Sequence, residues 1–215
     1  ETRRVVLGRP LSQALGPLLD HHRALGLPPA RRLPPALARA VRQGQDVTLV
    51  YATNGDQGPG VSGLDRGERL AALRKREALC AAEALGIETV HFFDLGDGTL
   101  GNAAHHPNSS ARKFTANLTS MFANEQFDIV VTWGPDGGYG HSDHRMASVL
   151  ITELVQAMDA GRPALLYPGI RKGTLPSVPE MQAWAETYPQ MLTLSVSYEP
   201  QDLAAATKAT QCHET

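Results

Sequence analysis

The sequence has few of the features that define specialised protein classes. It contains only two cysteines, Cys80 and Cys212, too few for a disulfide framework and too far apart for a C-x-x-C metal or redox pair. Two thiols packed against helices are favoured, and a bridge between Cys80 and Cys212 stays open. No apolar run approaches the ~20 residues that a membrane-spanning helix needs. The formal net charge is -2 and lysines and arginines are scattered, so no basic stripe is present and no nucleic acid is expected as a partner.

The length of 215 residues fits one buried core, because domains commonly contain roughly 100–200 residues. We therefore predict a single domain over residues 1–215. The chain begins at Glu1 without a charged and apolar leader. A cytoplasmic protein is favoured over an exported one whose leader has been removed, and a homo-oligomer stays open.

Short runs of β-branched and apolar residues alternate with helical patterns along the chain. Continuous runs of this kind are typical of strands buried on both faces, and they lie at 3–7, 47–51, 90–93 and 129–132. Helical patterns lie at 66–86, 111–124 and 143–159. The alternation predicts a three-layer α/β/α fold with a mostly parallel, Rossmann-like sheet. Ligands bind beyond the carboxyl ends of such strands, so the loops that follow them should converge on one crevice: those after Leu7, Tyr51, Phe93 and Thr132.

Two segments depart from this alternation. Proline pairs at 28–29 and 34–35 interrupt an amphipathic pattern, which predicts a helical hairpin at about 14–45 with a turn over 27–35 and a second helix ending at Gln43. The segment 168–189 is rich in proline and glycine and is predicted to be an irregular surface excursion. A strand is predicted after it, over 192–196.

The sharpest local signal is a glycine-rich loop that leaves the fourth predicted strand and enters a helix, W-G-P-D-G-G-Y-G-H-S-D-H over 133–144. Glycine permits the positive-φ path that turns a strand end back over a crevice. His141 and His144 are three residues apart and should face the same way, with Ser142 capping the first turn. In such a pair one imidazole can bind a metal while the other donates a hydrogen bond to an oxyanion. The alternative is a solvated histidine pair at a helix start.

This loop resembles the G-P-D-G-x-x-G-H-P-D-H signature of the PIG-L/LmbE-like zinc-dependent N-deacetylases, with Ser142 in place of proline. Further stretches resemble the same family in order along the chain, at 52–60, 73–87, 97–100 and 209–215. The resemblance implies an LmbE-like fold and removal of the N-acetyl group from an amino-sugar conjugate of the N-acetylglucosamine type by zinc-activated water. It also implies that His144 binds zinc and that His141 polarises the carbonyl oxygen of the substrate.

Other polar residues of the matched loops are candidates for the same site. Asp136 is a catalytic candidate, and the predicted substrate contacts are Asn54, Asp56, Arg74 and Asp97. Asp56 and Asp136 each stand beside or near glycine, so both also fit simple turn formers. Arg74 and Arg76 point in different directions on a helix, so at least one belongs to a solvated face. His213 either approaches the crevice or caps a helix end.

The first motif of the family, H-P-D-D-E after the first strand, has lost its reactive residues. The matching register places Arg9 for histidine, Leu11 for the general base and Ser12 for the aspartate ligand. A catalytic zinc needs three protein ligands, so His144 alone cannot hold it. The residues Asp20, His21 and His22 could replace the lost ligands, but consecutive residues fan around a helix and do not all aim at one ion.

Two functions therefore remain. The first is a zinc N-deacetylase, which the glycine-rich loop favours. The second is a catalytically inactive homologue that binds a sugar or another small molecule without metal, which the substitutions at Arg9, Leu11 and Ser12 favour. A dinucleotide-binding protein is a distant third, because no G-x-G-x-x-G follows the first predicted strand.

Overall fold

The computed structural model describes residues 4–8 and 33–215, and a parallel five-stranded sheet lies at its centre. The strand order is β3-β2-β1-β4-β5, and every pair is parallel. The strands are β1 (Arg4–Gly8), β2 (Asp46–Thr53), β3 (Thr89–Leu95), β4 (Ile129–Val131) and β5 (Ala164–Leu166). The α/β prediction and its first four strands are confirmed, whereas β5 was not predicted.

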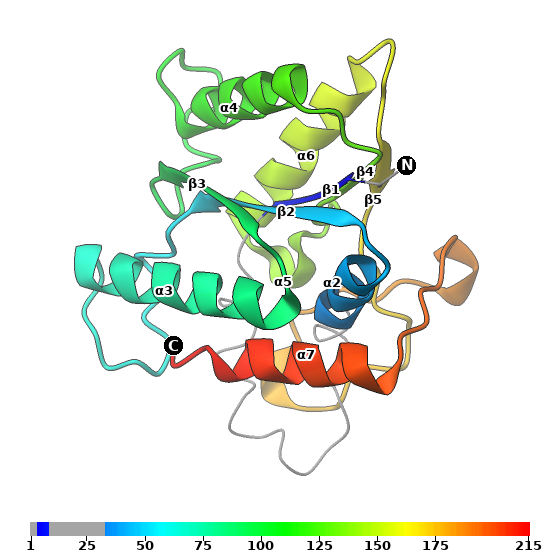
Figure 1. Cartoon of the computed structure of the whole chain (residues 1–215). Coiled ribbons are helices and arrows are strands. Elements are labelled where there is room, and N and C mark those ends of the chain that lie inside the picture. The colour runs from blue at the N-terminus through cyan, green and yellow to red at the C-terminus, as the bar shows by residue number, and fades with distance from the viewer. Residues whose placement is uncertain (1–3, 9–32) are drawn as a thin grey trace.

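Helices cover both faces of the sheet, which confirms the three layers (Figure 1). One face carries α4 (Ser110–Asn124) and α6 (Ser142–Gln156), and the other carries α2 (Leu33–Arg42), α3 (Glu68–Leu85) and α7 (Pro200–Gln211). β2 shows why the strands read as continuous apolar runs. Val47, Leu49 and Tyr51 pack toward α2, α3 and α7, while Val50 and Ala52 pack toward α4 and α6.

α2 begins at Leu33, inside the predicted proline-rich turn. Pro34 and Pro35 were placed in a turn, but both are buried in the first turn of this helix. Proline is tolerated there because the first N–H groups of a helix have no intrahelical acceptor. α2 ends at Arg42, one residue before the predicted end. The first helix of the predicted hairpin lies outside the described residues.

The segment between β5 and α7 is irregular, as predicted. It contains two single turns of 3-10 helix, η3 (Pro179–Met181) and η4 (Pro189–Met191), and one isolated bridge between Arg171 and Thr187. The predicted strand over 192–196 is wrong. Its apolar residues alternate, but in the described part of the chain no strand pairs with them, and Leu194 is 61% exposed. β5 was not predicted because it is only three residues long and lies between Pro163 and Tyr167.

The two cysteines form a disulfide, so the prediction of two separate thiols is wrong. Cys80 lies on α3 and Cys212 directly follows α7, with 5.7 Å between their Cα atoms. The bond joins two helices on the same face of the sheet. Proximity created by the fold, and not cysteine spacing, determines this pairing.

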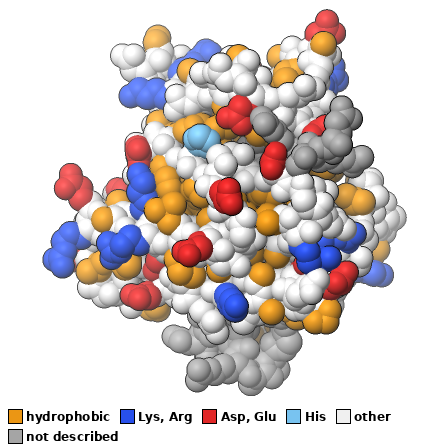
Figure 2. All heavy atoms as spheres, in the orientation of Figure 1, with side chains coloured by type: hydrophobic (Ala, Val, Ile, Leu, Met, Phe, Trp, Pro, Cys, Tyr) orange, Lys and Arg blue, Asp and Glu red, His pale blue; other side chains and the backbone are white. Residues whose placement is uncertain are grey.

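The surface mixes both signs of charge. On the face shown in Figure 2, acidic and basic side chains are interspersed among hydrophobic and uncharged polar ones. None of the helices in residues 33–215 has the length and hydropathy required to cross a lipid bilayer. The expected lack of a nucleic-acid partner stays a prediction.

Candidate functional site

The loops after β2 and β3 meet through Asp97. This carboxylate is 7% exposed and accepts hydrogen bonds from Thr53 Oγ1 and from the backbone N–H of Gln57, each at 3.3 Å. Thr53 ends β2, and Asp97 follows β3 by two residues. Asp97 therefore ties two neighbouring strand ends together at the carboxyl edge of the sheet.

The loop after β4 joins them through Asp143, the second residue of α6. Its carboxylate is fully buried and accepts from the backbone N–H groups of Gly98 at 2.8 Å and Leu100 at 3.1 Å. The predicted convergence of loops is thus confirmed for β2, β3 and β4. The loop after Leu7 lies outside the described residues. Sequence reasoning missed Asp143, although its place between His141 and His144 was a usable signal.

The glycine-rich turn adopts the positive-φ path that its glycines predict. Gly137 and Gly138 have φ values of 67° and 74° within α5 (Gly137–Gly140). A Cβ on Gly138 would lie 2.8 Å from Cζ3 of Trp133, so only glycine fits without movement. Asp136 Oδ1 accepts from the N–H of Gly138 at 2.5 Å. Asp136 thus shapes the turn, and its catalytic role stays a prediction.

His141 begins α6 and uses its own side chain as the cap. Its Nδ1 accepts from the backbone N–H of Asp143 at 3.3 Å, so the neutral ring carries its proton on Nε2. The prediction that Ser142 caps this turn is therefore wrong, and Ser142 is exposed. The half-buried imidazole of His141 is a hydrogen-bond donor held at a fixed orientation.

The hydrogen bond of His144 Nδ1 runs in the opposite direction to that of His141 Nδ1. It is fully buried, and its Nδ1 lies 3.0 Å from the carbonyl oxygen of Gly137. A carbonyl only accepts, so Nδ1 is the donor and Nε2 of the neutral ring carries the lone pair. The ring stacks on Trp133 with 4.1 Å between centroids and lies 4.7 Å from the ring of His141. Metal-binding histidines commonly show this arrangement, with one nitrogen fixed by a carbonyl.

The described residues do not by themselves fit a catalytic zinc. Members of the family are zinc-dependent, and such a site needs three protein ligands and an open position. Within residues 4–8 and 33–215, no group of three His, Cys, Asp or Glu side chains could hold a metal. His144 is one suitable donor, while Arg9, Ser12, Asp20, His21 and His22 lie outside the described residues.

The remaining substrate candidates hold the loops in place. Asn54 Nδ2 donates to Asp94 at 2.8 Å, and Asp56 Oδ2 accepts from Gln57 Nε2 at 2.6 Å. Arg74 is 5% exposed and donates to the carbonyl oxygen of Gly58. Arg74 therefore positions the wall formed by the loop after β2. Contacts of these residues with a substrate stay predictions.

His213 does not join the histidine pair. It is 7% exposed, and its Nδ1 lies 3.5 Å from Glu77 Oε2 on α3. Glu77 also accepts from the N–H groups of Glu214 and Thr215 and from the Thr215 hydroxyl. Burial acts to raise the pKa of Glu77, but its bonds with His213, Glu214 and Thr215 outweigh burial, so this pKa is lowered.

Aromatic rings surround the histidines, and sequence reasoning missed them. The Tyr139 ring lies 5.9 Å from His141, 5.3 Å from His144 and 5.3 Å from Trp184, measured between centroids. Trp133 and Tyr139 belong to the glycine-rich loop, which was a usable signal. Trp184 comes more than forty residues later, and nothing in its local sequence predicts this contact.

The sequence profile of the PIG-L family, described as GlcNAc-PI de-N-acetylase, matches residues 32–155. This range includes the loops after β2, β3 and β4 and the histidine pair. The chain belongs to this family. The resemblance drawn from the glycine-rich loop is thereby confirmed.

Individual relatives agree with this assignment. A 1D-myo-inositol 2-acetamido-2-deoxy-alpha-D-glucopyranoside deacetylase of Corynebacterium diphtheriae is 33% identical over 140 residues, which cover 59% of this chain and 48% of the relative. The chain thus matches about half the length of its curated relatives.

Two solved structures share the fold. Teicoplanin deacetylase Orf2 in its zinc-inhibited form has a TM-score of 0.60 and 15% identity, with 97% of this chain and 84% of Orf2 covered. The 4-carboxy-2-hydroxymuconate hydratase GalB of Pseudomonas putida has a TM-score of 0.53 and 20% identity, with 78% of this chain and 63% of GalB covered. At such identities the likeness shows the fold alone, and the names of these proteins show that one fold carries different reactions.

Proposed function

We propose that this chain hydrolyses the N-acetyl amide of an amino-sugar conjugate of the N-acetylglucosamine type. The supporting observation is the pair of adjacent imidazoles at the convergence of three strand ends. His141 presents a proton on Nε2, and buried His144 presents a lone pair on Nε2. The reaction adds water across the amide C–N bond and releases acetate and the free amine.

His141 is the group suited to the carbonyl oxygen of the amide. Its orientation is fixed by the N–H of Asp143, so its Nε2–H can donate to the oxygen as negative charge develops on it. A preorganised donor of this kind typically contributes ~10²–10³-fold to the rate. His144 is the zinc ligand that the described residues offer, which is fewer than the three that a catalytic zinc needs.

The sugar would lie against the walls of the crevice. Asp97 and the loop held by Arg74 form the β2 and β3 side, and Asp97 is the predicted contact for a hydroxyl group there. Asn54 and Asp56 lie on the loop after β2, and Asp136 lies on the loop after β4. The curated relative named for an inositol-linked 2-acetamido sugar supports this class of substrate.

A second function, binding of the conjugate without hydrolysis, has its own supporting observation. Arg9, Leu11 and Ser12 occupy the positions of the histidine ligand, the general base and the aspartate ligand in the matching register. Arginine carries a fixed positive charge and cannot bind a dication. Such a protein would keep the crevice and lack turnover.

One experiment separates the two functions. Purified protein is analysed for zinc and then incubated with 1D-myo-inositol 2-acetamido-2-deoxy-α-D-glucopyranoside, and both bound ligand and released primary amine are measured. The variants are His144→Ala and His141→Ala, with His105→Ala as the matched control because His105 is exposed on the loop before α4.

For a hydrolase we expect bound zinc and amine release. His144→Ala should lose both, His141→Ala should keep zinc and lose ~10²-fold or more in kcat, and His105→Ala should match the unaltered protein. Metal-free protein that binds the conjugate without amine release would establish the second function. Protein that binds neither zinc nor conjugate contradicts both.

A further inference from the structure

Trp184 comes from a distant part of the chain and contacts Tyr139, whose ring lies beside the histidine pair. The segment around η3 docks on the glycine-rich turn, where the N–H of Ala185 donates to the carbonyl oxygen of Gly138 at 2.9 Å. Met181 is 2% exposed and anchors the same segment. The segment is therefore fixed by contacts on both sides of Trp184.

The indole of Trp184 closes an aromatic wall beside the site. Its centroid lies 5.3 Å from that of Tyr139, whose ring also contacts both histidines. A Cβ on Gly138 would lie 2.8 Å from Cζ3 of Trp133 and 3.3 Å from Cζ3 of Trp184, so an edge of each indole lies close to this glycine. Trp184 is half-buried, so part of its side chain stays accessible.

The aromatic wall, formed by Trp133, Tyr139 and Trp184, offers an apolar surface beside the polar groups of the site. The histidines suit an amide group, and the carboxylates of the β2 and β3 loops suit hydroxyls, but a hexose ring also has faces made of C–H groups. Ligand pockets commonly combine a few polar groups with aromatic surfaces, and tryptophan offers a large apolar surface at low entropic cost.

We infer that Trp184 is a specificity-determining residue that packs against the hexose ring of the conjugate. This inference rests on the proposed function. Trp184 positions the sugar and takes no part in bond breaking, so its loss weakens binding and leaves the chemical step intact. The irregular segment after β5 thereby becomes part of the site.

The test compares ligands with and without the ring. Binding of 1D-myo-inositol 2-acetamido-2-deoxy-α-D-glucopyranoside and of N-methylacetamide is measured for the unaltered protein, Trp184→Ala and Trp184→Phe. Met191→Ala is the matched control, because Met191 lies on the same segment and is 70% exposed. We expect Trp184→Ala to weaken binding of the sugar about tenfold, which corresponds to an aromatic contact of ordinary strength. Trp184→Phe should weaken it less, and binding of N-methylacetamide should not change.

Fluorescence separates a ligand contact from a packing role. The chain has only two tryptophans, so the difference between the unaltered protein and Trp184→Phe reports on Trp184. The sugar conjugate should protect Trp184 from quenching by acrylamide, which an indole that only anchors the segment would not show. If hydrolysis occurs, KM should rise about tenfold in Trp184→Ala with kcat unchanged.

The outcomes distinguish this inference from the proposed function. If the unaltered protein binds the sugar, but Trp184→Ala binds it equally well and quenching is unaffected, the inference is wrong and the proposed function stands. If the unaltered protein does not bind the sugar at all, both are wrong.

Discussion

The two faces of the sheet are held by different interactions. Toward α2, α3 and α7 the buried apolar side chains that the helices contribute are mostly alanines: Ala38, Ala78, Ala81, Ala82 and Ala209. Toward α4 and α6 the buried side chains contributed by the helices and loops are mostly large: Leu100, Phe114, Leu118, Phe127, Ile151 and Val155. Because buried apolar area stabilises by about 25 cal/mol per Å², the face with alanines gains less from each helix.

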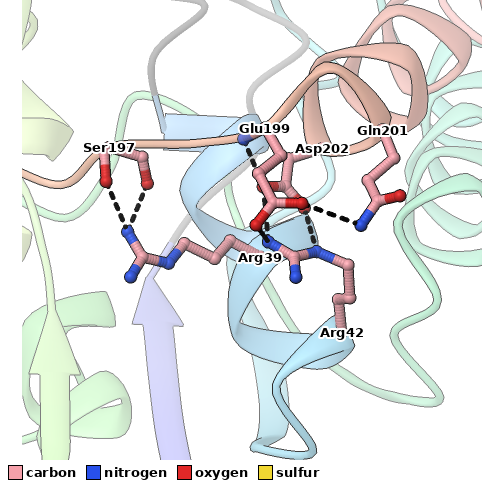
Figure 3. A network of polar contacts seen from close by, with 6 residues as sticks. All are labelled: Arg39, Arg42, Ser197, Glu199, Gln201 and Asp202. Atoms are coloured by element: carbon pink, nitrogen blue, oxygen red, sulfur yellow. Dashed lines mark hydrogen bonds and ion pairs between the residues drawn. The ribbon is translucent and has the colours of Figure 1, made fainter.

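Cross-links occur on the face with the small side chains. The Cys80–Cys212 disulfide joins α3 to α7, and Arg42 of α2 binds Asp202 of α7 through Nε at 2.8 Å and Nη2 at 3.0 Å (Figure 3). Glu199 adds a contact of 3.3 Å with Arg42. On the other face Phe93 and Phe114 meet edge to face with 5.9 Å between centroids. Covalent and ionic links thus join helices on the alanine-rich face, and an aromatic pair joins β3 to α4 on the other face.

The largest effect is expected from truncating the face with large side chains. Phe114 is fully buried, so Phe114→Ala should leave a cavity and lower the free energy of unfolding by about 3–5 kcal/mol. Chemical denaturation measures this change. Phe114→Leu serves as control and should cost less. Equal losses for both variants would contradict a packing origin.

The next largest effect is expected from the disulfide. Replacing both cysteines, as Cys80→Ala with Cys212→Ala, should lower the free energy of unfolding by about 2–4 kcal/mol because a long loop is no longer closed in the unfolded chain. Reduction of the unaltered protein should produce a similar loss. A double variant as stable as the oxidised protein would show that the alanine-rich face does not need this link.

A smaller effect is expected at Glu77, a buried residue of α3 on the alanine-rich face. Glu77→Gln should lower the free energy of unfolding by about 1–2 kcal/mol at neutral pH, because bonds to a charged acceptor are weakened. Amide hydrogen exchange should rise at Glu214 and Thr215. Unchanged exchange there would argue that the backbone is held without the carboxylate.

The smallest effect is expected from Asp202, and it depends on pH. Hydrogen bonds from Arg42 lower the pKa of Asp202 to about 2 from its usual 3.8. The folded pKa is the lower one, so the stabilisation is present above the unfolded pKa and is lost as pH falls from 3.8 toward 2. The stability difference between the unaltered protein and Asp202→Asn should therefore shrink over this range in thermal unfolding. A constant difference would contradict the ion pair as its source.

Local sequence patterns predicted the strands and the glycine-rich turn of the site better than the contacts that distant segments make with them. The buried run 47–51 and the glycines before His141 adopt structures that depend mainly on residues close to them in sequence. The strands, the glycine-rich turn and the histidine pair could therefore be predicted. The Cys80–Cys212 bond and the contact of Trp184 with Tyr139 depend on which distant segments meet, which no local pattern encodes. Over 192–196, alternation predicted a strand, but a strand also requires a neighbour to pair with.

β1 occupies the middle of the sheet, between β2 and β4. In the described chain the outer pairs, β3 with β2 and β4 with β5, are connected within the sheet only by this five-residue strand. Val5 pairs with Ile129, so on the ribosome β1 emerges more than a hundred residues ahead of one of its partners. The nascent protein must therefore keep this strand available until β4 has been made. A break in the loop before α4 would create two fragments that are joined within the sheet by the β1–β4 ladder, and outside it by the Cys80–Cys212 bond and by the packing of α7 on α2 and α3.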